Sequence, residues 1–227
     1  MKKQITISVF LLICTMLANG FTLKANATRT IALSRTQPTN IAAIPPDLSK
    51  AVLTLQDLPS GFTEMSSGLE TLKTQLNKVK DFKTESVFAY QKSDSKEFQL
   101  ILGFTVNIPT RIEQVGFDNG LREGKLGEEV LAGLNSRSNS RGVKFSNPTP
   151  IQLGDNIGDV SGGWTIEGEI EGTPMRVDMA AFRRGNLGAI LMTFYLDGDT
   201  PSIAIADAAR KLDNRMVELN PPPPTQP

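Results

Sequence analysis

The sequence predicts an α+β domain in which an antiparallel sheet of about five to seven strands carries packed helices. Residues 158–196 alternate apolar and polar side chains and contain two glycine turns, which is typical of an antiparallel meander. Two further strand-like stretches precede it, at 85–91 and 98–106. Apolar residues at helical spacing lie between the two groups of strands and again near the C-terminus, and such amphipathic helices pack on a sheet.

The N-terminal segment, residues 1–27, has the pattern of a secretory signal. Lys2 and Lys3 precede an apolar run that ends in the small-residue sequence Ala-Asn-Ala at 25–27. The apolar run of about 13 residues is shorter than the roughly 20 that cross a bilayer, which favours cleavage over retention as an anchor. Acylation at Cys14 is disfavoured because Ile13 stands where lipoprotein processing needs a small residue.

Two further segments, one on each side of the expected domain, differ from it in composition. Residues 28–46 are polar and include a Pro-Pro pair, so they predict a flexible linker. Residues 220–227 are rich in proline and predict a disordered tail. One α+β domain is therefore expected over 47–219.

Composition excludes several kinds of chemistry. The 227 residues include no histidine, and Cys14 is the single cysteine. Catalytic triads with histidine, histidine-ligated haem and the usual zinc sites therefore lack their residues. Cleavage after residue 27 would also remove Cys14, which would leave no cysteine nucleophile. Without residues 1–27 the chain has 21 basic against 24 acidic residues and no clustered basic patch, which argues against nucleic-acid binding. The sequence predicts no enzyme activity and no cofactor.

The first elements of the domain are short. Asp47 is positioned to cap a helical turn that runs through Leu48, Val52 and Leu55. Residues 57–62 predict a turn, because a proline and a glycine lie between two apolar anchors. A small helix is expected over 68–79.

A helical region should follow the 85–106 hairpin. It begins after Thr110 and is expected to turn Ile112, Val115 and Leu121 inward. After Gly124 a second apolar stripe continues the region. Its members are Leu126, Val130, Leu131 and Leu134.

The meander has a predicted register. Two-residue turns at 171–172 and 185–186 bring apolar residues together on one face across three strands. The expected pairs are Ile166 with Val177, Trp164 with Met179, Ala181 with Ile190, Met179 with Met192, Val177 with Phe194 and, on the other face, Glu167 with Arg176.

The other face of the meander mixes apolar side chains, such as Ala180, Phe182 and Leu191, with polar ones. We expect the middle helical region to cover it, with a ligand as the alternative. The last helix should start at Pro201, after Asp199 or Thr200 as a cap, and should bury a stripe of apolar residues. That stripe consists of Ile205, Ala208, Leu212 and Met216.

Several polar groups are candidate sites. Glu167, Glu169 and Glu171 share one strand face at about 7 Å intervals, which suits a carboxylate hydrolase or, more simply, a solvated surface. Acidic residues at 155–159 and 197–199 lack the spacing of a calcium loop. Arg183 and Arg184 at a turn suit either an anionic partner or solvent, and Trp164 suits the core.

Residues 53–62, LTLQDLPSGF, provide a family resemblance. The segment resembles the secreted DLPxGF/W domains of bacterial lipoproteins and kinase sensors, which are similar to the PsbP-like fold, an α-β-α arrangement. The matching residues specify a turn and no activity. The resemblance implies a non-catalytic extracytoplasmic module, although this chain lacks the lipoprotein acylation motif and has no cysteine after residue 27.

Three functions follow as hypotheses. The first is an exported binding or sensor module, periplasmic, extracellular or lumenal, that engages a protein partner or small ligand through Arg176, Asp178 and Tyr195, with Arg183 and Arg184 as further candidates. The second is a peripheral assembly subunit of a membrane-associated complex, as the PsbP-like resemblance suggests. The third is a carboxylate-based hydrolase. No metal site is predicted, and the sequence does not specify an oligomeric state.

Overall fold

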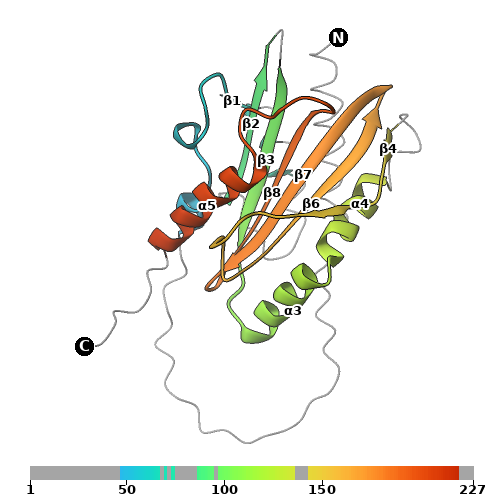
Figure 1. The fold of residues 1–227 in the computed structure, drawn as a ribbon. Helices are drawn as coiled ribbons and strands as arrows, with labels where there is room; N and C mark the ends of the chain where they lie inside the picture. The colour runs from blue at the N-terminus through green and yellow to red at the C-terminus, as the bar shows by residue number, and fades with distance from the viewer. Residues whose placement is uncertain are drawn as a thin grey trace, which may run out of the picture.

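A computed structural model describes residues 47–66, 69–70, 73–74, 86–94, 97–135 and 143–219. The fold is α+β: one antiparallel sheet has helices on both faces (Figure 1). The eight strands have the order β1-β2-β3-β8-β7-β6-β4, and β5 also pairs with β6. Their bounds are β1 Thr63–Glu64, β2 Val87–Ser93, β3 Phe98–Asn107, β4 Val143–Phe145, β5 Thr149–Ile151, β6 Val160–Ile170, β7 Thr173–Arg184 and β8 Leu187–Leu196.

The strand number exceeds the predicted five to seven. The prediction missed short strands at the two edges of the sheet: β1 has two residues, and β4 and β5 have three each. Segments this short carry too few residues to show an alternating pattern. They protect the longer strands, because a short edge strand offers few unpaired backbone groups to another chain.

The predicted meander register is confirmed in every pair. Ile166 lies opposite Val177, Val177 opposite Phe194, and Glu167 opposite Arg176. Turns at Glu171-Gly172 and Gly185-Asn186 join the strands, with positive φ at Gly172 and Gly185. A shift by one residue would have moved each apolar side chain to the other face, so the alternation fixes the pairing.

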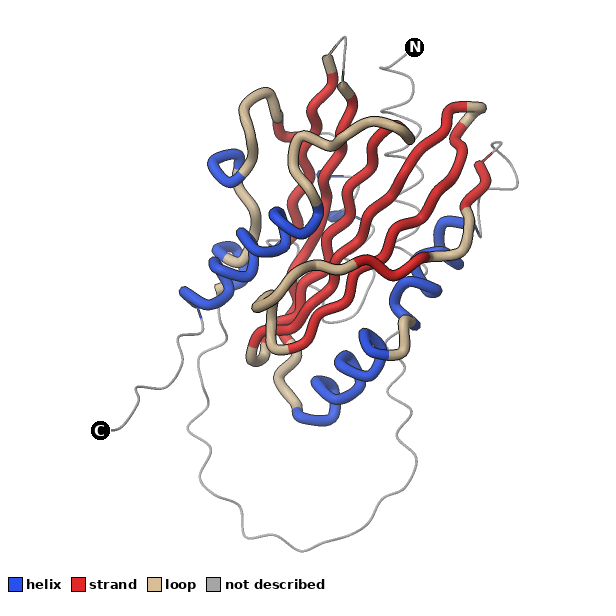
Figure 2. Tube along the Cα trace, viewed as in Figure 1, coloured by secondary structure: helices blue, strands red, loops and turns tan. Residues whose placement is uncertain are grey.

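Two helices cover one face of the sheet, as Figure 2 shows. They are α3 (Arg111–Arg122) and α4 (Lys125–Asn135). Phe117 and Leu121 of α3 and Leu126 of α4 join a buried cluster with Trp164 and Ile166. Trp164 is therefore a core residue, as expected.

The opposite face is covered by α5 (Ile205–Leu219) together with residues 48–62. The expectation that the middle helical region covers Ala180, Phe182 and Leu191 is wrong, because these residues pack with α5. Both faces of the central strands contain buried apolar residues, so the pattern of apolar residues gave no preference for one helix over another. The inward stripe of α5 is confirmed, but the helix begins at Ile205 and not at Pro201.

The orientation of α3 also differs from the prediction. Ile112 is 76% exposed and Val115 is also exposed, whereas Phe117, Asp118 and Leu121 face the sheet. The inward stripe contains a charged residue, so an apolar pattern favoured the wrong side of the helix. Leu121 is buried as expected.

The turn predicted at 57–62 is present. The helical turn expected through Leu48, Val52 and Leu55 is shorter than predicted, because it ends at Lys50, and Leu55 is exposed. Asp47 caps the 3₁₀ turn Leu48–Lys50 by accepting a hydrogen bond from the Ser49 N–H. Leu58 and Phe62 are buried, and Gly61 has a φ of 97°. The turn thus anchors the start of the domain against the α5 face.

Asp57, in the second 3₁₀ turn Leu55–Asp57, forms a capping box with Thr54. Its carboxylate also accepts a hydrogen bond from Arg215 of α5 at 2.9 Å. The DLPxGF-type segment therefore has a structural partner in the C-terminal helix.

Several predicted segments lie outside the described residues. These are the signal at 1–27, the linker at 28–46, the tail at 220–227 and most of the helix expected over 68–79. In the part of the chain that is described, no helix combines the length and apolar character that crossing a membrane requires.

Candidate functional site

A polar group of side chains lies on the α5 face near the N-terminal end of β7. We call Glu167, Arg176, Asp178, Tyr195 and Asp197 the sheet shelf. Strand pairing aligns Glu167, Arg176 and Tyr195 across β6, β7 and β8. The alternation of β7 places Asp178 on the same face, two residues after Arg176. The predicted juxtaposition of Arg176, Asp178 and Tyr195 is therefore what the structure has.

Arg176 links the shelf to the loop after β8. Its Nε donates to Asp197 Oδ1 at 3.1 Å, and its Nη2 donates to Glu167 Oε1 at 2.9 Å. Burial acts to lower the pKa of Arg176, but the hydrogen bond and charge of Asp197 raise it overall. The Arg176 side chain is 34% exposed, and its guanidinium stays charged. It is thus held in one orientation while part of it faces solvent.

Tyr195 and Asp178 form the inner part of the shelf. The Tyr195 hydroxyl donates to Asp178 Oδ2 at 2.8 Å. Burial raises the pKa of Tyr195, and the hydrogen bond and charge of Asp178 raise it further. The phenol consequently remains a neutral donor. Three carboxylates and one guanidinium give the shelf an excess of acceptor oxygens, which suits a cationic or hydrogen-bond-donating partner.

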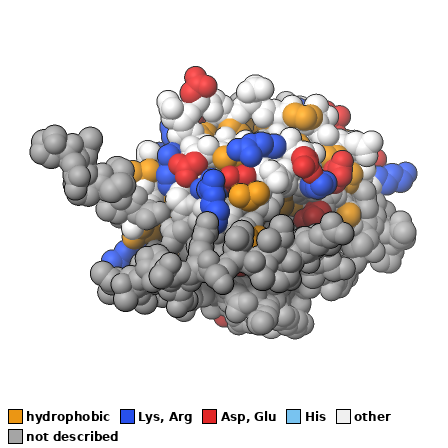
Figure 3. Space-filling model, turned by 90° about the horizontal axis from the view of Figure 1, so that it is seen from below, with side chains coloured by type: hydrophobic (Ala, Val, Ile, Leu, Met, Phe, Trp, Pro, Cys, Tyr) orange, Lys and Arg blue, Asp and Glu red, His pale blue; other side chains and the backbone are white. Residues whose placement is uncertain are grey.

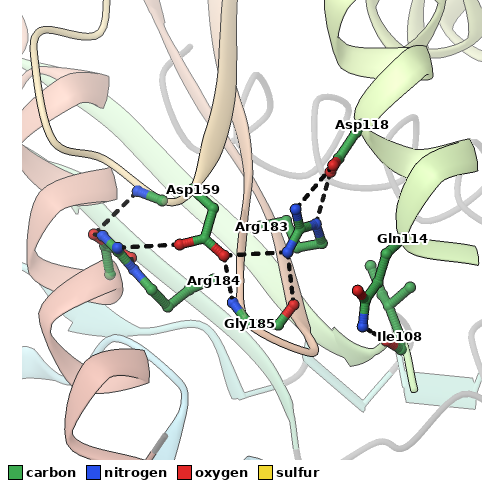
Figure 4. Close-up of polar contacts among 9 residues, drawn as sticks. Ile108, Gln114, Asp118, Asp159, Arg183, Arg184 and Gly185 are labelled. Atoms are coloured by element: carbon green, nitrogen blue, oxygen red, sulfur yellow. Dashed lines mark hydrogen bonds and ion pairs between the residues drawn. The ribbon is translucent and has the colours of Figure 1, made fainter. Parts of the chain in front are cut away.

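The two adjacent arginines at the β7–β8 turn belong to a different cluster. We call Asp118, Asp159, Arg183, Arg184 and Asp213 the arginine clamp (Figure 4). Arg183 donates through Nε and Nη2 to both oxygens of Asp118, at 2.7 and 2.8 Å. It is only 6% exposed, so the expectation of a solvated turn is wrong for this residue. Its charge is neutralised inside the fold.

Arg184 faces the other helical layer. Its Nε donates to Asp213 Oδ1 of α5 at 2.9 Å, and its Nη2 also contacts Asp213. Its Nη1 donates to Asp159 Oδ1 at 3.4 Å. Each nitrogen of both guanidinium groups is thus engaged within the protein, which disfavours Arg183 and Arg184 as an anion-binding pair.

The electrostatics of the clamp favour ionised groups. The hydrogen bond from Arg183 lowers the pKa of Asp118 and outweighs the effect of burial. Asp118 in turn raises the pKa of Arg183. The buried pair is therefore charged, with bidentate geometry that offsets its desolvation.

The carboxylates that are candidates for hydrolysis or calcium binding are exposed to solvent or paired with arginines. Glu167 is 61% exposed and paired with Arg176, and Glu169 is also exposed. Asp159 is engaged by the clamp arginines. Among the described residues, no group of three or more acidic, histidine or cysteine side chains is arranged to hold a metal ion.

Sequence reasoning missed Asp118 and Asp213 as members of a site. Both are charged residues inside otherwise apolar helix faces, beside Phe117 and Leu212. A charge at such a position signals a buried partner, because a lone buried carboxylate is costly. The partners, however, lie 65 and 29 positions away in the sequence, so spacing alone did not reveal them.

Comparison with known proteins adds no family assignment. No family model matches the chain, and no curated protein matches it. The functional argument therefore depends on the geometry of this chain.

Proposed function

We propose that this protein is a non-catalytic extracytoplasmic binding or sensor module whose contact surface is the sheet shelf. The proposal is based on the observation that helix α5 buries only part of its face of the sheet. Ala180 and Leu191 are fully buried beneath the helix, whereas Glu167, Arg176 and Asp197 remain partly exposed. Export is proposed from the signal-like residues 1–27.

The shelf suits recognition because its side chains are already ordered. Arg176 is held by two carboxylates, and the Tyr195 hydroxyl is held by Asp178. A partner would not need to immobilise these groups, which lowers the entropic cost of binding. The DLPxGF-like residues 53–62 and the helices on both sheet faces support a relationship to PsbP-like domains, which fits a binding role.

Native mass spectrometry tests this proposal. Untagged protein isolated from its own organism should carry a copurifying protein or a defined small mass. Arg176→Ala should lose that mass while keeping its circular dichroism spectrum. Arg122→Ala is the matched control, because Arg122 is exposed on α3, on the opposite side of the sheet. Retention of the mass by Arg176→Ala, or a bare monomer in every sample, would contradict the proposal.

A second candidate function is a peripheral assembly subunit of a membrane-associated complex. The exposure of Ile112 and Val115 on α3 favours it, because apolar side chains gain free energy when a partner covers them. The exposed Arg111 and Glu113 flank Ile112, so a contact at this surface would also include charged groups. The test is fractionation of source membranes: high salt should release an assembly subunit by screening these charged contacts. Recovery in the soluble fraction at low salt would argue against this function.

A further inference from the structure

The arginine clamp touches all three layers of the fold at one point. Arg183 and Arg184 are neighbours in β7, so their side chains leave opposite faces of the sheet. Arg183 reaches Asp118 of α3 on one side, and Arg184 reaches Asp213 of α5 on the other. Figure 4 shows the two guanidinium groups extending in different directions from the turn, with Asp159 between them.

Asp159 connects these two ion pairs. Its Oδ2 accepts from Arg183 Nη1 at 3.1 Å and from the Gly185 N–H at 2.8 Å. Its Oδ1 accepts from Arg184 Nη1 at 3.4 Å. One carboxylate is therefore shared between the arginine that holds α3 and the arginine that holds α5.

The loop before β6 reinforces this link. The Asp159 N–H donates to the Arg183 carbonyl at 2.6 Å. The Gly158 N–H donates to Asp213 Oδ2 at 3.1 Å. Residues 158–159 thus contact the turn and helix α5 through the backbone as well as through a side chain.

We propose that the arginine clamp couples the two helical layers, so that loosening α3 on one face loosens α5 on the other. Two guanidinium groups share three carboxylates. If Asp118 is withdrawn, the buried Arg183 must draw more strongly on Asp159, because a buried charge without a partner is costly. Asp159 then holds Arg184 less firmly, and the contact of Arg184 with α5 weakens.

This arrangement would transmit a change across the sheet. A partner that displaces α3 at its exposed face would alter the stability of α5, which covers the other face. The physical basis is a contiguous network with shared groups, in which one side cannot change its partners independently. The inference does not depend on the proposed function of the sheet shelf.

Native-state hydrogen exchange of the mature protein tests the coupling. In Asp118→Asn, amides at the C-terminal half of α3 should exchange at least tenfold faster. Amides of α5 around Asp213 should exchange at least threefold faster, after both are normalised to Leu102 and Leu191 in the central strands. The normalisation separates local loosening from global unfolding. Asp207→Asn, which removes an exposed acid of α5, is the control and should change neither helix.

Asp159→Asn provides the decisive comparison. Asp159 is 42% exposed, so the variant should fold even if Asp118→Asn does not. By the same argument it should not speed exchange in α3 or α5, because Arg183 and Arg184 then depend more strongly on Asp118 and Asp213. In the double variant it should abolish the effect of Asp118→Asn on α5. Asp155→Asn in the same loop is its matched control. For Asp118→Asn, exchange that rises in α3 but not in α5, or that rises equally in the central strands, would overturn the proposal. Faster exchange of either helix in Asp159→Asn alone, or an effect on α5 that persists in the double variant, would also overturn it.

Discussion

Two helical glycines should respond in opposite ways to the same substitution. Gly116 lies in α3, where an added Cβ would meet nothing within 4 Å. Gly127 lies in α4, where the Cβ would be 3.0 Å from Cδ1 and 3.1 Å from Cγ of Trp164. The indole cannot simply move away, because a Cβ on Gly162 would be 2.7 Å from its Cη2, so the ring already fills the space between the two glycines.

The magnitudes follow from two terms. Alanine is favoured over glycine within a helix by about 1 kcal/mol, because glycine loses more backbone entropy on folding. Gly116→Ala should therefore stabilise the domain by about 0.5–1 kcal/mol. At Gly127 the same gain is opposed by overpacking of about 1–3 kcal/mol, which leaves a net loss of about 1 kcal/mol.

Urea unfolding followed by far-ultraviolet circular dichroism measures both effects. With a slope of about 2 kcal/mol/M, the midpoint should rise by roughly 0.4 M for Gly116→Ala and fall by roughly 0.5 M for Gly127→Ala. Trp164→Leu should reverse the sign of the second change, since the smaller side chain removes the clash. Equal stabilisation by both alanines, or a loss at Gly127 that persists beside Leu, would refute this account of the packing.

Three further outcomes are expected. Arg184→Met should destabilise the domain by about 2–3 kcal/mol in urea unfolding, since Asp213, its buried partner on α5, loses a counter-charge. The same change at Arg122, an exposed arginine of α3, should alter the free energy of unfolding by no more than about 0.5 kcal/mol. The chain has two tyrosines, and burial raises the pKa of both Tyr90 and Tyr195. Phenolate absorbance at about pH 10.5 should therefore be lower in the folded protein than in the unfolded protein, and stability should fall as pH rises above about 10. Arg183 lowers the pKa of Asp118, so the stability that this pair contributes should be present above about pH 4 and be lost as pH falls further. In that pH range the melting temperature of Asp118→Asn should therefore depend less on pH than that of the unchanged protein.

The meander shows where local sequence is sufficient. Its register depends on the turns at 171–172 and 185–186 and on the alternation of side chains such as Ile166 and Val177, all within about forty residues. The predicted register also places the shelf residues Arg176 and Tyr195 opposite each other, as the structure does. This prediction succeeds because neighbouring strands in a meander are also neighbours in sequence.

Helix α3 shows where local sequence is insufficient. Its apolar residues Ile112 and Val115 suggested one inward face, but the structure buries Asp118 and exposes Ile112. The charge is tolerated inward because Arg183 meets it with two hydrogen bonds. A helical pattern alone contains no information about a cation on a distant strand.

The sequence by itself determined the α+β class, the strand register of the meander and the absence of histidine chemistry, because each depends on composition or on contacts between near neighbours. Only the tertiary structure decided which helix covers which face of the sheet and joined Arg183 and Arg184 to aspartates on both helical layers. Both faces of the central strands are apolar, so either helix would satisfy the hydrophobic pattern. The contacts that accompany the choice, such as Arg183 with Asp118 and Arg184 with Asp213, join residues far apart in the sequence, and local periodicity contains no information about them.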